Sequence, residues 1–371
     1  MSLRVAFIHD WLTGMRGGER VLEGLCRLYP QAELFTLVHV RGSVSPVVEG
    51  RSVHTSFVQR LPRSARYYRL YLPLFPLAVE QFDLDRFDLV VSSSHCAAKA
   101  VVTTGRTRHL CYCHSPMRYA WDQFDAYFGE ARLGRVTSRL MRRLMRRMAR
   151  WDAATAGRVD RFVANSRHVA GKIRRYYNRQ ATVVYPPVDT AFFHPDGTAP
   201  GDYFLVVSAL VPYKRIDLAI AAAAKAGVRL KIAGVGAERP RLERLAGPSV
   251  EFLGRVPNET VRDLYRGARA VLMPGEEDFG IVPVEAQACG RPVVALASGG
   301  VLETIEDGVT GVLVTEATVE AFVDGMRRVA RDAFDPQVLR ARAERFSEER
   351  FLAGMTEAIT DVLAAPGDAR W

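Results

Sequence analysis

The sequence predicts an α/β protein built from two doubly wound parallel sheets, one in each half of the chain. Short apolar runs typical of buried strands alternate with stretches of helical periodicity, which indicates repeated βαβ units. This alternation stops once, where prolines and glycines gather between residues 186 and 200, and then restarts. At 371 residues the chain is also too long for a single typical core.

These breaks define the expected domains. We predict a Rossmann-like domain over residues 1–185, a linker over 186–200, a second Rossmann-like domain over 201–346 and a final helical segment over 347–371. In the first half, strands are expected at residues 4–8, 88–92, 109–113, 161–166 and 181–185, with a helix at 19–28. In the second half, strands are expected at 203–208, 229–233, 250–253, 270–273 and 292–295, and helices at 216–226, 239–246, 259–267, 284–289 and 318–331.

Composition is that of a soluble globular protein, with 48% hydrophobic and 25% charged residues. No apolar run approaches the roughly 18 residues that span a bilayer, and the first residues read as a strand, not a signal peptide. The five cysteines are odd in number and scattered, which favours a reduced, cytoplasmic protein. A net charge of +10 favours anionic partners such as lipid head groups, nucleic acid or nucleotide-sugar phosphates, although coding bias toward Arg explains part of it.

The most informative segment begins with Glu277 and ends with Glu285, eight positions later. A turn with one glycine, Gly280, separates them, and Glu285 is expected at the start of a helix that ends at Gly290. The free N–H groups of such a turn and the positive helix end suit a phosphate, and Glu285 then suits a ribose diol. The alternative from spacing alone is an ordinary strand–turn–helix with two solvated acids.

This segment resembles the Glu-x7-Glu signature of glycosyltransferase family 4, whose members are retaining enzymes of the GT-B fold. The resemblance extends over nearly all of the chain. It is nearest to bacterial mannosyltransferases of O-antigen and exopolysaccharide assembly, which carry segments similar to Cys113–Tyr119 and Val211–Arg215. The resemblance implies two Rossmann-like domains facing a cleft, a final helix that crosses back to the first domain, and hexosyl transfer from a nucleotide sugar without a metal.

Lys214 and Arg215 follow a predicted strand, at the sheet edge where open α/β folds bind ligands. A cation here stabilises the nucleoside diphosphate that leaves in the transition state. In the family an Arg usually precedes this Lys in the same loop, but this chain has Ala209 there. We expect Arg215 or another Arg to supply the missing charge; the alternative is a basic helix start that faces water.

Two further segments are expected to meet the transferred sugar. The loop 13–20 resembles the family's glycine-rich loop, and Gly17 and Gly18 permit close approach of its backbone. His114 directly follows a strand, and the resemblance implies that it hydrogen-bonds the donor sugar beside the reacting carbon. We therefore assign catalysis to His114, Lys214 and Glu277, whereas a lone His is otherwise often structural.

The remaining donor-binding residues follow from the same resemblance. The segment 252–258 resembles the strand and loop that hold the donor base. The predicted donor-binding residues, in addition to Gly17, Gly18 and Arg215, are Val256, Asn258, Phe279, Gly280, Ile281, Val282 and Glu285.

No metal or other cofactor is expected. Cys111 and Cys113 lie on one face of a predicted strand, and zinc ligands normally leave two or more residues between cysteines. Asp83 and Asp85 superficially match an Asp-x-Asp metal motif, but they precede a strand, which indicates turn and capping chemistry.

A basic amphipathic helix is predicted over 132–151, with Arg recurring beside an apolar stripe. It suits an anionic membrane surface, although an ordinary helix docking its stripe on the first domain is the alternative. The segment 60–71 interleaves Arg and Tyr, which suits lipid head groups or a lipid diphosphate acceptor. The predicted membrane or acceptor residues are Arg66, Tyr67, Tyr68, Arg69, Arg143, Arg146 and Arg147.

Together these features predict transfer of a hexose, mannose from GDP-mannose, to a lipid-linked or glycan acceptor at the inner face of the cytoplasmic membrane. A UDP-sugar donor is the alternative within the enzyme class. An inactive GT-B-like partner subunit is a second alternative, prompted by Ala209. A nucleic-acid-binding protein would leave the paired glutamates and His114 unexplained, and no nucleic-acid partner is expected.

Overall fold

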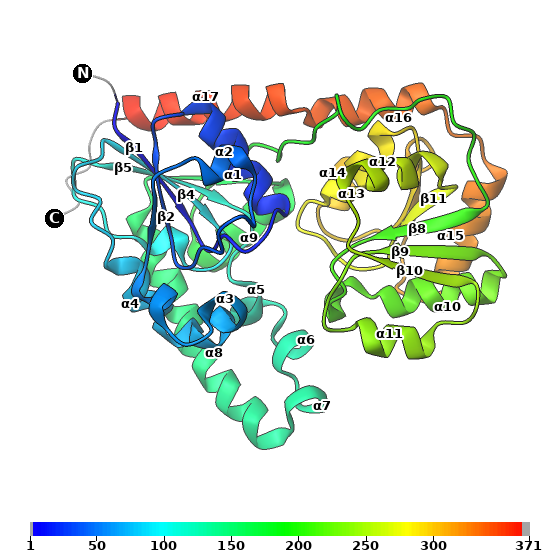
Figure 1. Ribbon diagram of the computed structural model, residues 1–371, viewed down its shortest axis with the longest axis horizontal. Coiled ribbons are helices and arrows are strands. Elements are labelled where there is room, and N and C mark those ends of the chain that lie inside the picture. Colours follow the sequence, from blue (N-terminus) through cyan, green and yellow to red (C-terminus); the bar gives the residue numbers. More distant parts are fainter. Residues whose placement is uncertain (1–2, 366–371) are drawn as a thin grey trace. The chain divides into compact units, whose positions relative to one another are not determined.

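A computed structural model describes residues 3–365 of the chain, and these form two compact units (Figure 1). The first unit comprises Met1–Pro187 and Glu349–Trp371, and the second comprises Val188–Glu348. Residues 188–200, expected as linker, are therefore grouped with the second unit. Each unit contains one parallel sheet covered by helices on both faces. This is the α/β architecture that the alternation of strands and helices predicted.

The first unit has a seven-stranded sheet in the order β3-β2-β1-β4-β5-β6-β7. Every neighbouring pair is parallel. The strands are β1 (Val5–His9), β2 (Glu33–Thr36), β3 (Val53–Thr55), β4 (Leu89–Ser94), β5 (Arg108–Cys113), β6 (Arg161–Ala164) and β7 (Ala181–Val183). The central strands β1 and β4 are buried along their whole length, which explains why their side chains, apart from His9, are apolar or small.

Helices from both ends of this unit's sequence cover one face of the sheet. Val21 and Leu25 of α1 (Gly17–Leu28) share a buried cluster with Phe351 and Met355 of α17 (Glu348–Ala364). Gly24 permits this packing, because a Cβ there would lie 2.8 Å from the Phe351 ring. The carboxy-terminal helix thus packs in the first unit, although the segment directly before it belongs to the second.

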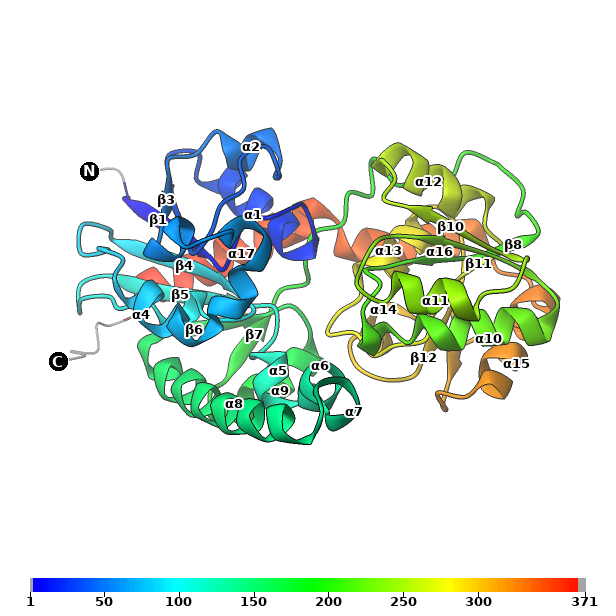
Figure 2. The same cartoon turned by 60° about the horizontal axis from the view of Figure 1, so that its bottom comes forward.

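The helices between β3 and β7 lie on the side of the opposite face, some packed on the sheet and some on other helices. They are α3 (Ser64–Tyr67), α4 (Phe75–Glu80), α5 (Arg118–Trp121), α6 (Phe124–Phe128), α7 (Glu130–Leu133), α8 (Arg135–Thr155) and α9 (Arg167–Tyr177). Figure 2 shows the short helices α5 to α7 gathered near the beginning of α8. The helix α2 (Pro46–Glu49) lies beside α1.

The second unit has six parallel strands in the order β10-β9-β8-β11-β12-β13. They are β8 (Tyr203–Val207), β9 (Arg229–Ala233), β10 (Val250–Gly254), β11 (Ala270–Met273), β12 (Val293–Leu296) and β13 (Gly311–Val314). Its helices are α10 (Ile216–Ala226), α11 (Arg239–Leu245), α12 (Asn258–Gly267), α13 (Ile281–Ala288), α14 (Val301–Thr304), α15 (Val319–Arg331) and α16 (Pro336–Ala343). Apolar residues of α10 and α15 pack together on one face, and α12 and α13 contact the sheet as well.

Short 3-10 turns complete the secondary structure. They lie at Phe57–Arg60, Tyr68–Leu74, Ala98–Ala100, Ala156–Arg158, Pro212–Lys214 and Glu344–Phe346.

Several sequence predictions differ from these elements. The strands β2, β3 and β13, of three or four residues each, were not predicted. The helix predicted over 132–151 is divided at Gly134, whose φ of 76° is left-handed, so that α8 begins at Arg135 and continues to Thr155. The helix predicted at 284–289 begins earlier, at Ile281.

The strand order reverses at one place in each sheet. In the first unit this place lies between β1 and β4, and in the second between β8 and β11. In open α/β sheets the loops that leave the carboxyl ends of the strands diverge at such a place, and ligands of these sheets bind there. We call this place the crevice of each unit. The same edges carry most of the residues selected from the sequence.

Candidate functional site

The crevice of the second unit brings Lys214 and Glu277 together. Lys214 ends the 3-10 turn that follows β8, and Glu277 lies in the loop that follows β11. Lys214 Nζ forms an ion pair with Glu277 Oε1. Gly275 makes this approach possible, because a Cβ there would lie 2.4 Å from the carbonyl oxygen of Tyr213. Residues 63 positions apart are thus joined by the strand order.

This ion pair is largely removed from solvent. The side chain of Lys214 is 17% exposed and that of Glu277 is 10% exposed. Charges in such a place interact more strongly than charges in bulk water. The crevice therefore holds a fixed cation, with an acid beside it that orients the ammonium group.

Arg215 is placed differently from Lys214. Its backbone adopts φ 50°, a left-handed conformation, at the start of α10. Its Nε lies 3.5 Å from Asp217 Oδ1 on the same helix, and its side chain is about half exposed. Ala209 is exposed in the preceding loop. The resemblance leads one to expect a positive charge at position 209, and Arg215 or another Arg was expected to replace it. In the structure the Arg215 guanidinium contacts Asp217 and is not held beside Lys214.

A third loop, which follows β12, closes on the acidic segment. The amide of Gly300 donates to the carbonyl of Glu277 at 2.7 Å, and Ser298 Oγ donates to Glu276 Oε2 at 2.6 Å. A Cβ at Gly299 or Gly300 would lie 2.2 or 2.3 Å from backbone oxygens of residues 277 and 278. Glycine is needed at both positions because the two loops touch through their backbones.

The turn before α13 has the geometry of an anion site. Gly280 adopts φ 88° directly before the first helical residue, Ile281, so the N–H groups of the first turn have no partners within the helix. Because α13 begins at Ile281, Glu285 lies in its second turn and not at its start. Glu285 is 6% exposed, and Oε2 accepts a hydrogen bond from the Tyr265 hydroxyl at 2.8 Å.

The other predicted donor-binding residues lie near these loops or in the core. Phe279 is buried, with its ring 5.5 Å from that of Phe346 in an edge-to-face contact. Val256 follows β10 and Asn258 is the first residue of α12, where it is exposed. Phe279 therefore anchors the turn by packing, whereas Ile281 and Val282 remain partly exposed in the first turn of α13.

His114 lies at the corresponding edge of the first unit, directly after β5. Its Nε2 is 2.8 Å from Ser93 Oγ, and Ser93 Oγ is 3.1 Å from His9 Nδ1. Burial, followed by the neighbouring His95 and His9, lowers the pKa of His114 well below its ordinary value. The imidazole is therefore neutral at neutral pH and can exchange hydrogen bonds with a sugar hydroxyl.

Gly18 lies directly against these imidazoles. A Cβ there would be 3.5 Å from His9 Cε1 and 3.6 Å from His114 Nε2. Gly17 and Gly18 were predicted to lie in a loop, but in the structure they begin helix α1. The start of this helix is capped by Glu19, whose Oε2 accepts the N–H of Arg16 at 3.0 Å. A side chain at position 18 would therefore lie in van der Waals contact with both rings.

Asp10 is a residue that the sequence analysis did not select. Its carboxylate is fully buried and accepts the backbone N–H groups of residues 95, 96, 97 and 98, at 2.7, 2.9, 2.6 and 2.8 Å. His95 Nδ1 lies 3.1 Å from the same carboxylate. Asp10 therefore holds the loop after β4 at the crevice. The available signal was its place directly after the first strand, next to His9.

Basic residues on α8 are exposed, but its apolar stripe is divided. Leu144, Met148 and Trp151 pack on the core, whereas Val136 and Leu140 are 82% and 67% exposed. Arg143, Arg146 and Arg147 are exposed as well. The second half of α8 docks on its domain, as one alternative held, and the first half leaves apolar and basic side chains in solvent.

The Arg- and Tyr-rich segment also divides into core and surface. Arg66, Tyr67 and Arg69 are exposed, but Tyr68 is 5% exposed and its ring lies 4.9 Å from that of Trp11. The expected contact of Tyr68 with head groups is corrected, because this side chain is part of the core.

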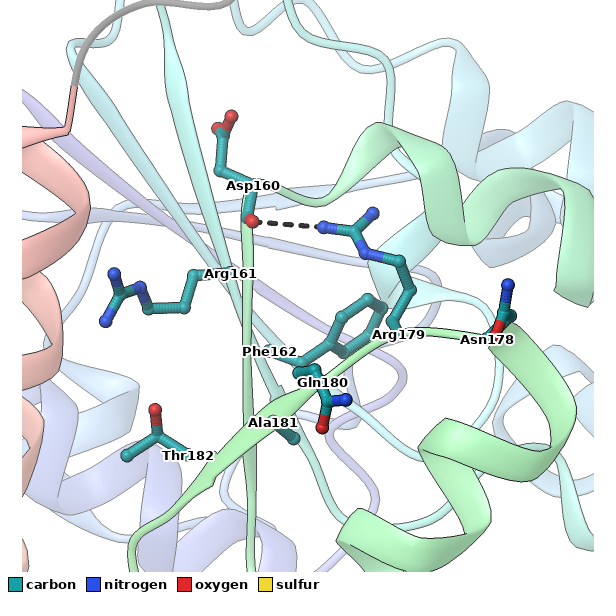
Figure 3. Close-up of a pocket in the computed structure, with 8 residues that line it drawn as sticks. All are labelled: Asp160, Arg161, Phe162, Asn178, Arg179, Gln180, Ala181 and Thr182. Carbon is teal, nitrogen blue, oxygen red and sulfur yellow. Dashed lines mark hydrogen bonds between the residues drawn. The ribbon is translucent and has the colours of Figure 1, made fainter.

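A cavity of about 540 Å³ lies away from these crevices, at the amino ends of β6 and β7 (Figure 3). Its charged groups already have partners. Arg161 pairs with Asp361 at 2.8 Å, and Arg179 donates to the carbonyls of residues 156, 159 and 160. This cavity lies at the opposite edge from the one that binds ligands in such sheets.

Within residues 3–365, no group of three or more His, Cys, Asp and Glu side chains is arranged to hold a metal ion. Asp83 and Asp85 form a turn, in which Asp83 Oδ1 accepts the N–H of Asp85 at 3.3 Å. Cys111 and Cys113 share one buried cluster on the same face of β5, as predicted. In the same part of the chain, no helix is long and apolar enough to cross a membrane.

Solved structures share the architecture of both units. Anabaena Alr3699/HepE, in complex with UDP and glucose, has a TM-score of 0.72 at 19% identity, covering 97% of this chain and 100% of that one. Sucrose-phosphate synthase from Thermosynechococcus elongatus has a TM-score of 0.73 at 20% identity, covering 98% and 100%. At such identities the likeness shows the fold alone, and that fold is GT-B.

Curated relatives are similar over part of the chain. D-inositol 3-phosphate glycosyltransferases from Geodermatophilus obscurus and Mycolicibacterium smegmatis are 35% identical over 236 residues and 34% identical over 238 residues. These regions cover 54% and 56% of this chain and 52% and 55% of the relatives. The chain therefore spans about half the length of the curated relatives it matches.

Two family models match consecutive regions. One described as Glycosyltransferase Family 4 matches residues 15–192, and one described as Glycosyl transferases group 1 matches residues 193–349. The boundary between them falls close to the division between the two units, at residues 187 and 188. With this order of domains and the GT-B fold, the chain belongs to glycosyltransferase family 4.

Proposed function

We propose that this glycosyltransferase moves a hexose with retention from a nucleotide sugar to a lipid-linked or glycan acceptor, without a metal. One observation carries the proposal: Lys214, Glu277 and the first turn of α13 converge at the crevice of the second unit. A cation and the N–H groups at the start of a helix suit the diphosphate of a donor. Glu285, buried beside Tyr265, is the acid that would accept hydrogen bonds from the ribose.

In the proposed reaction the bond between the anomeric carbon and the diphosphate breaks first. The acceptor then approaches the anomeric carbon from the same face of the sugar that the diphosphate leaves, which retains the configuration. Lys214 stabilises the negative charge that develops on the leaving diphosphate. A diphosphate oxygen takes the proton of the acceptor hydroxyl, whose oxygen then bonds to the anomeric carbon. His114 and Glu277 position hydroxyl groups of the sugar, and Arg215 adds positive charge near the diphosphate once its contact with Asp217 opens.

GDP-mannose is the first donor that we propose, because the segments 113–119 and 211–215 resemble those of mannosyltransferases. A UDP-sugar is the second candidate, supported by the complexes of HepE with UDP and with UDP-glucose. D-inositol 3-phosphate, named in the relatives above, belongs among the acceptors to be tested.

A panel of nucleotide sugars tests the donor. The correct donor at about 100 times its dissociation constant stabilises the protein by about 2.7 kcal/mol, which thermal unfolding detects. We expect GDP-mannose to give the largest shift and to be hydrolysed or transferred equally well in EDTA. Activity that EDTA removes and manganese restores contradicts the metal-free mechanism, and a larger shift with UDP-sugars selects the second candidate.

Replacing Glu285 tests the ribose contact. We expect Glu285→Ala to weaken binding of GDP and of GDP-mannose alike, by about 1.5–3 kcal/mol, because a charged hydrogen-bond acceptor is lost. Calorimetric titration measures both affinities. Tyr265→Phe is the matched control, since it removes the same hydrogen bond but leaves the carboxylate. GDP affinity unchanged in Glu285→Ala would exclude this role.

We further propose that the first unit contacts anionic membrane. The exposed half of α8 offers Val136 and Leu140 beside exposed arginines, and the exposed Leu70 and Leu77 lie in the segments around α3 and α4. Apolar side chains that enter the head-group region, flanked by cations, are typical of helices that lie on a membrane.

Liposome flotation tests this contact. Vesicles with anionic lipid are expected to bind the protein, and added salt is expected to weaken binding through screening. Changing Arg143, Arg146 and Arg147 together to Gln is expected to weaken the free energy of membrane binding by about 1 kcal/mol for each charge near the surface. The same change at Arg244, Arg327 and Arg345, exposed on the second unit, is the control for net charge and is expected to leave flotation intact. Equal losses in both triple variants, or no flotation at low salt, would refute the contact.

A further inference from the structure

A row of four polar side chains ends on His114. Ser93 Oγ lies 2.8 Å from His114 Nε2 and 3.1 Å from His9 Nδ1. On the other side of its ring, His9 Nε2 lies 3.8 Å from Glu19 Oε1. Strands β1 and β4 supply His9 and Ser93, the first turn of α1 supplies Glu19, and His114 follows β5.

The first three members of this row are inaccessible to solvent. Ser93, His9 and Glu19 are 0%, 1% and 3% exposed. The other carboxylate oxygen of Glu19 is held by the N–H of Arg16 at 3.0 Å. Burial alone would raise the pKa of Glu19, but the neighbouring His9 lowers it below its ordinary value. Glu19 is therefore a carboxylate at neutral pH, fixed in place and directed at His9.

When both rings are neutral and the Ser93 hydroxyl donates its single proton to one of them, the row has two possible directions. In one, Ser93 donates to His114 Nε2, so His114 carries its proton on Nδ1 and His9 donates from Nδ1. In the other, His114 donates from Nε2 to Ser93, and Ser93 donates to His9 Nδ1. A neutral imidazole has one donor and one acceptor nitrogen, so fixing one ring fixes the other.

Glu19 distinguishes these directions. In the first, the bare lone pair of His9 Nε2 faces a carboxylate, and the two repel. In the second, His9 carries its proton on Nε2, which points toward Glu19. We propose that Glu19, acting through His9 and Ser93, holds His114 in the tautomer that is protonated on Nε2 and leaves Nδ1 free to accept a hydrogen bond.

This inference rests on the proposed function for its consequence. A hydroxyl of the transferred sugar would donate to the free Nδ1 of His114, and the opposite tautomer would present an N–H to that hydroxyl instead. Glu19, His9 and Ser93 are then positioning residues for His114. Gly18 leaves room for the sugar at the same place, because it has no Cβ against the two rings.

Nitrogen-15 NMR of the full-length protein without ligand reads the tautomer directly. We expect His114 to be protonated on Nε2 in the wild-type protein. Glu19→Gln keeps an acceptor for the N–H of Arg16 but offers an amide that can donate to His9, so it should raise the Nδ1-protonated form of His114. Ser93→Ala breaks the row and should give a mixture of tautomers. Protonation of wild-type His114 on Nδ1, as expected if His9 carries two protons, would overturn the proposal, and so would unchanged tautomers in both variants.

A matched control lies one residue away on the same strand. Ser92 Oγ is 2.8 Å from His109 Nε2, and both side chains are fully buried. Ser92→Ala therefore removes an equivalent buried hydrogen bond between Ser and His without interrupting the row to His114. We expect it to leave the tautomer of His114 unchanged. If Ser92→Ala changed the tautomer of His114 as much as Ser93→Ala does, the cause would be a general disturbance of packing around β4. That result would overturn the proposal.

Kinetics provide the second readout. We expect Glu19→Gln and Ser93→Ala to lower kcat about tenfold, as for loss of one well-oriented hydrogen bond, with unchanged affinity for the free nucleoside diphosphate. Ser92→Ala should keep kcat. Should no nucleotide sugar react with the wild-type protein while the tautomers behave as stated, the proposed function fails and the row stands. Normal kcat in both variants, with an active wild-type protein, overturns the role of the row.

Discussion

Lys214→Ala is expected to lower kcat for hexosyl transfer by about 10²–10³-fold, the loss that follows removal of one fixed group that stabilises developing charge. This chain has Ala209 where the family usually has an Arg in this loop, and Arg215 interacts with Asp217 in the structure. Lys214 is therefore the cation that the second unit holds in its crevice through Glu277. Steady-state kinetics with the donor selected by the nucleotide-sugar panel measure the loss.

The control for Lys214→Ala is a second Lys–Glu ion pair in the same unit. Lys225 pairs with Glu320 between α10 and α15, where both side chains are exposed. Lys225→Ala removes the same charge from the surface, where an exposed ion pair contributes little to stability. We expect Lys225→Ala to keep full activity. Lys214→Ala with kcat within about threefold of wild type would contradict the role of Lys214 at the diphosphate, because its charge would then have contributed less than about 1 kcal/mol to the transition state.

Asp10→Ala is expected to produce the largest loss of stability, above about 3 kcal/mol in the free energy of unfolding. Each buried N–H left without an acceptor costs about 1–3 kcal/mol, and Asp10 accepts four of them. We expect a loss smaller than the sum of these four costs, because the loop after β4 can relax toward solvent and rehydrate some of its N–H groups. Urea unfolding followed by circular dichroism measures the change.

Asp88→Ala is the control on the same sheet. Asp88 precedes β4 and pairs with Arg4 at 2.8 Å, where the two side chains are 42% and 60% exposed. Screening by solvent makes such an exposed pair contribute little to stability. The stability loss of Asp10→Asn should lie between those of Asp10→Ala and Asp88→Ala, since the Asn side chain keeps one acceptor oxygen. Equal stability losses in Asp10→Ala and Asp88→Ala would show that the buried carboxylate does not hold the loop.

Local sequence patterns were sufficient for most elements, because long apolar runs and helical periodicity are local properties. The helix at 216–226 and the strands at 229–233 and 270–273 were predicted with the bounds that the structure gives. The strand β3 was missed because its three residues, Val-His-Thr, form neither an apolar run nor a period. The equally short β7 was predicted, because it begins a longer run of β-forming residues. The interruption at Gly134 was missed because helical spacing continues across it.

The sequence by itself determined the fold class and the family, because strand–helix alternation and the segments around His114, Lys214 and Glu277 are written along the chain. The tertiary structure alone decided which side chains meet. Strand order, not sequence distance, places Lys214 against Glu277 and joins Glu19, His9, Ser93 and His114. Parallel strands bring their carboxyl ends to one edge, so residues far apart in sequence become neighbours only once the sheet has formed.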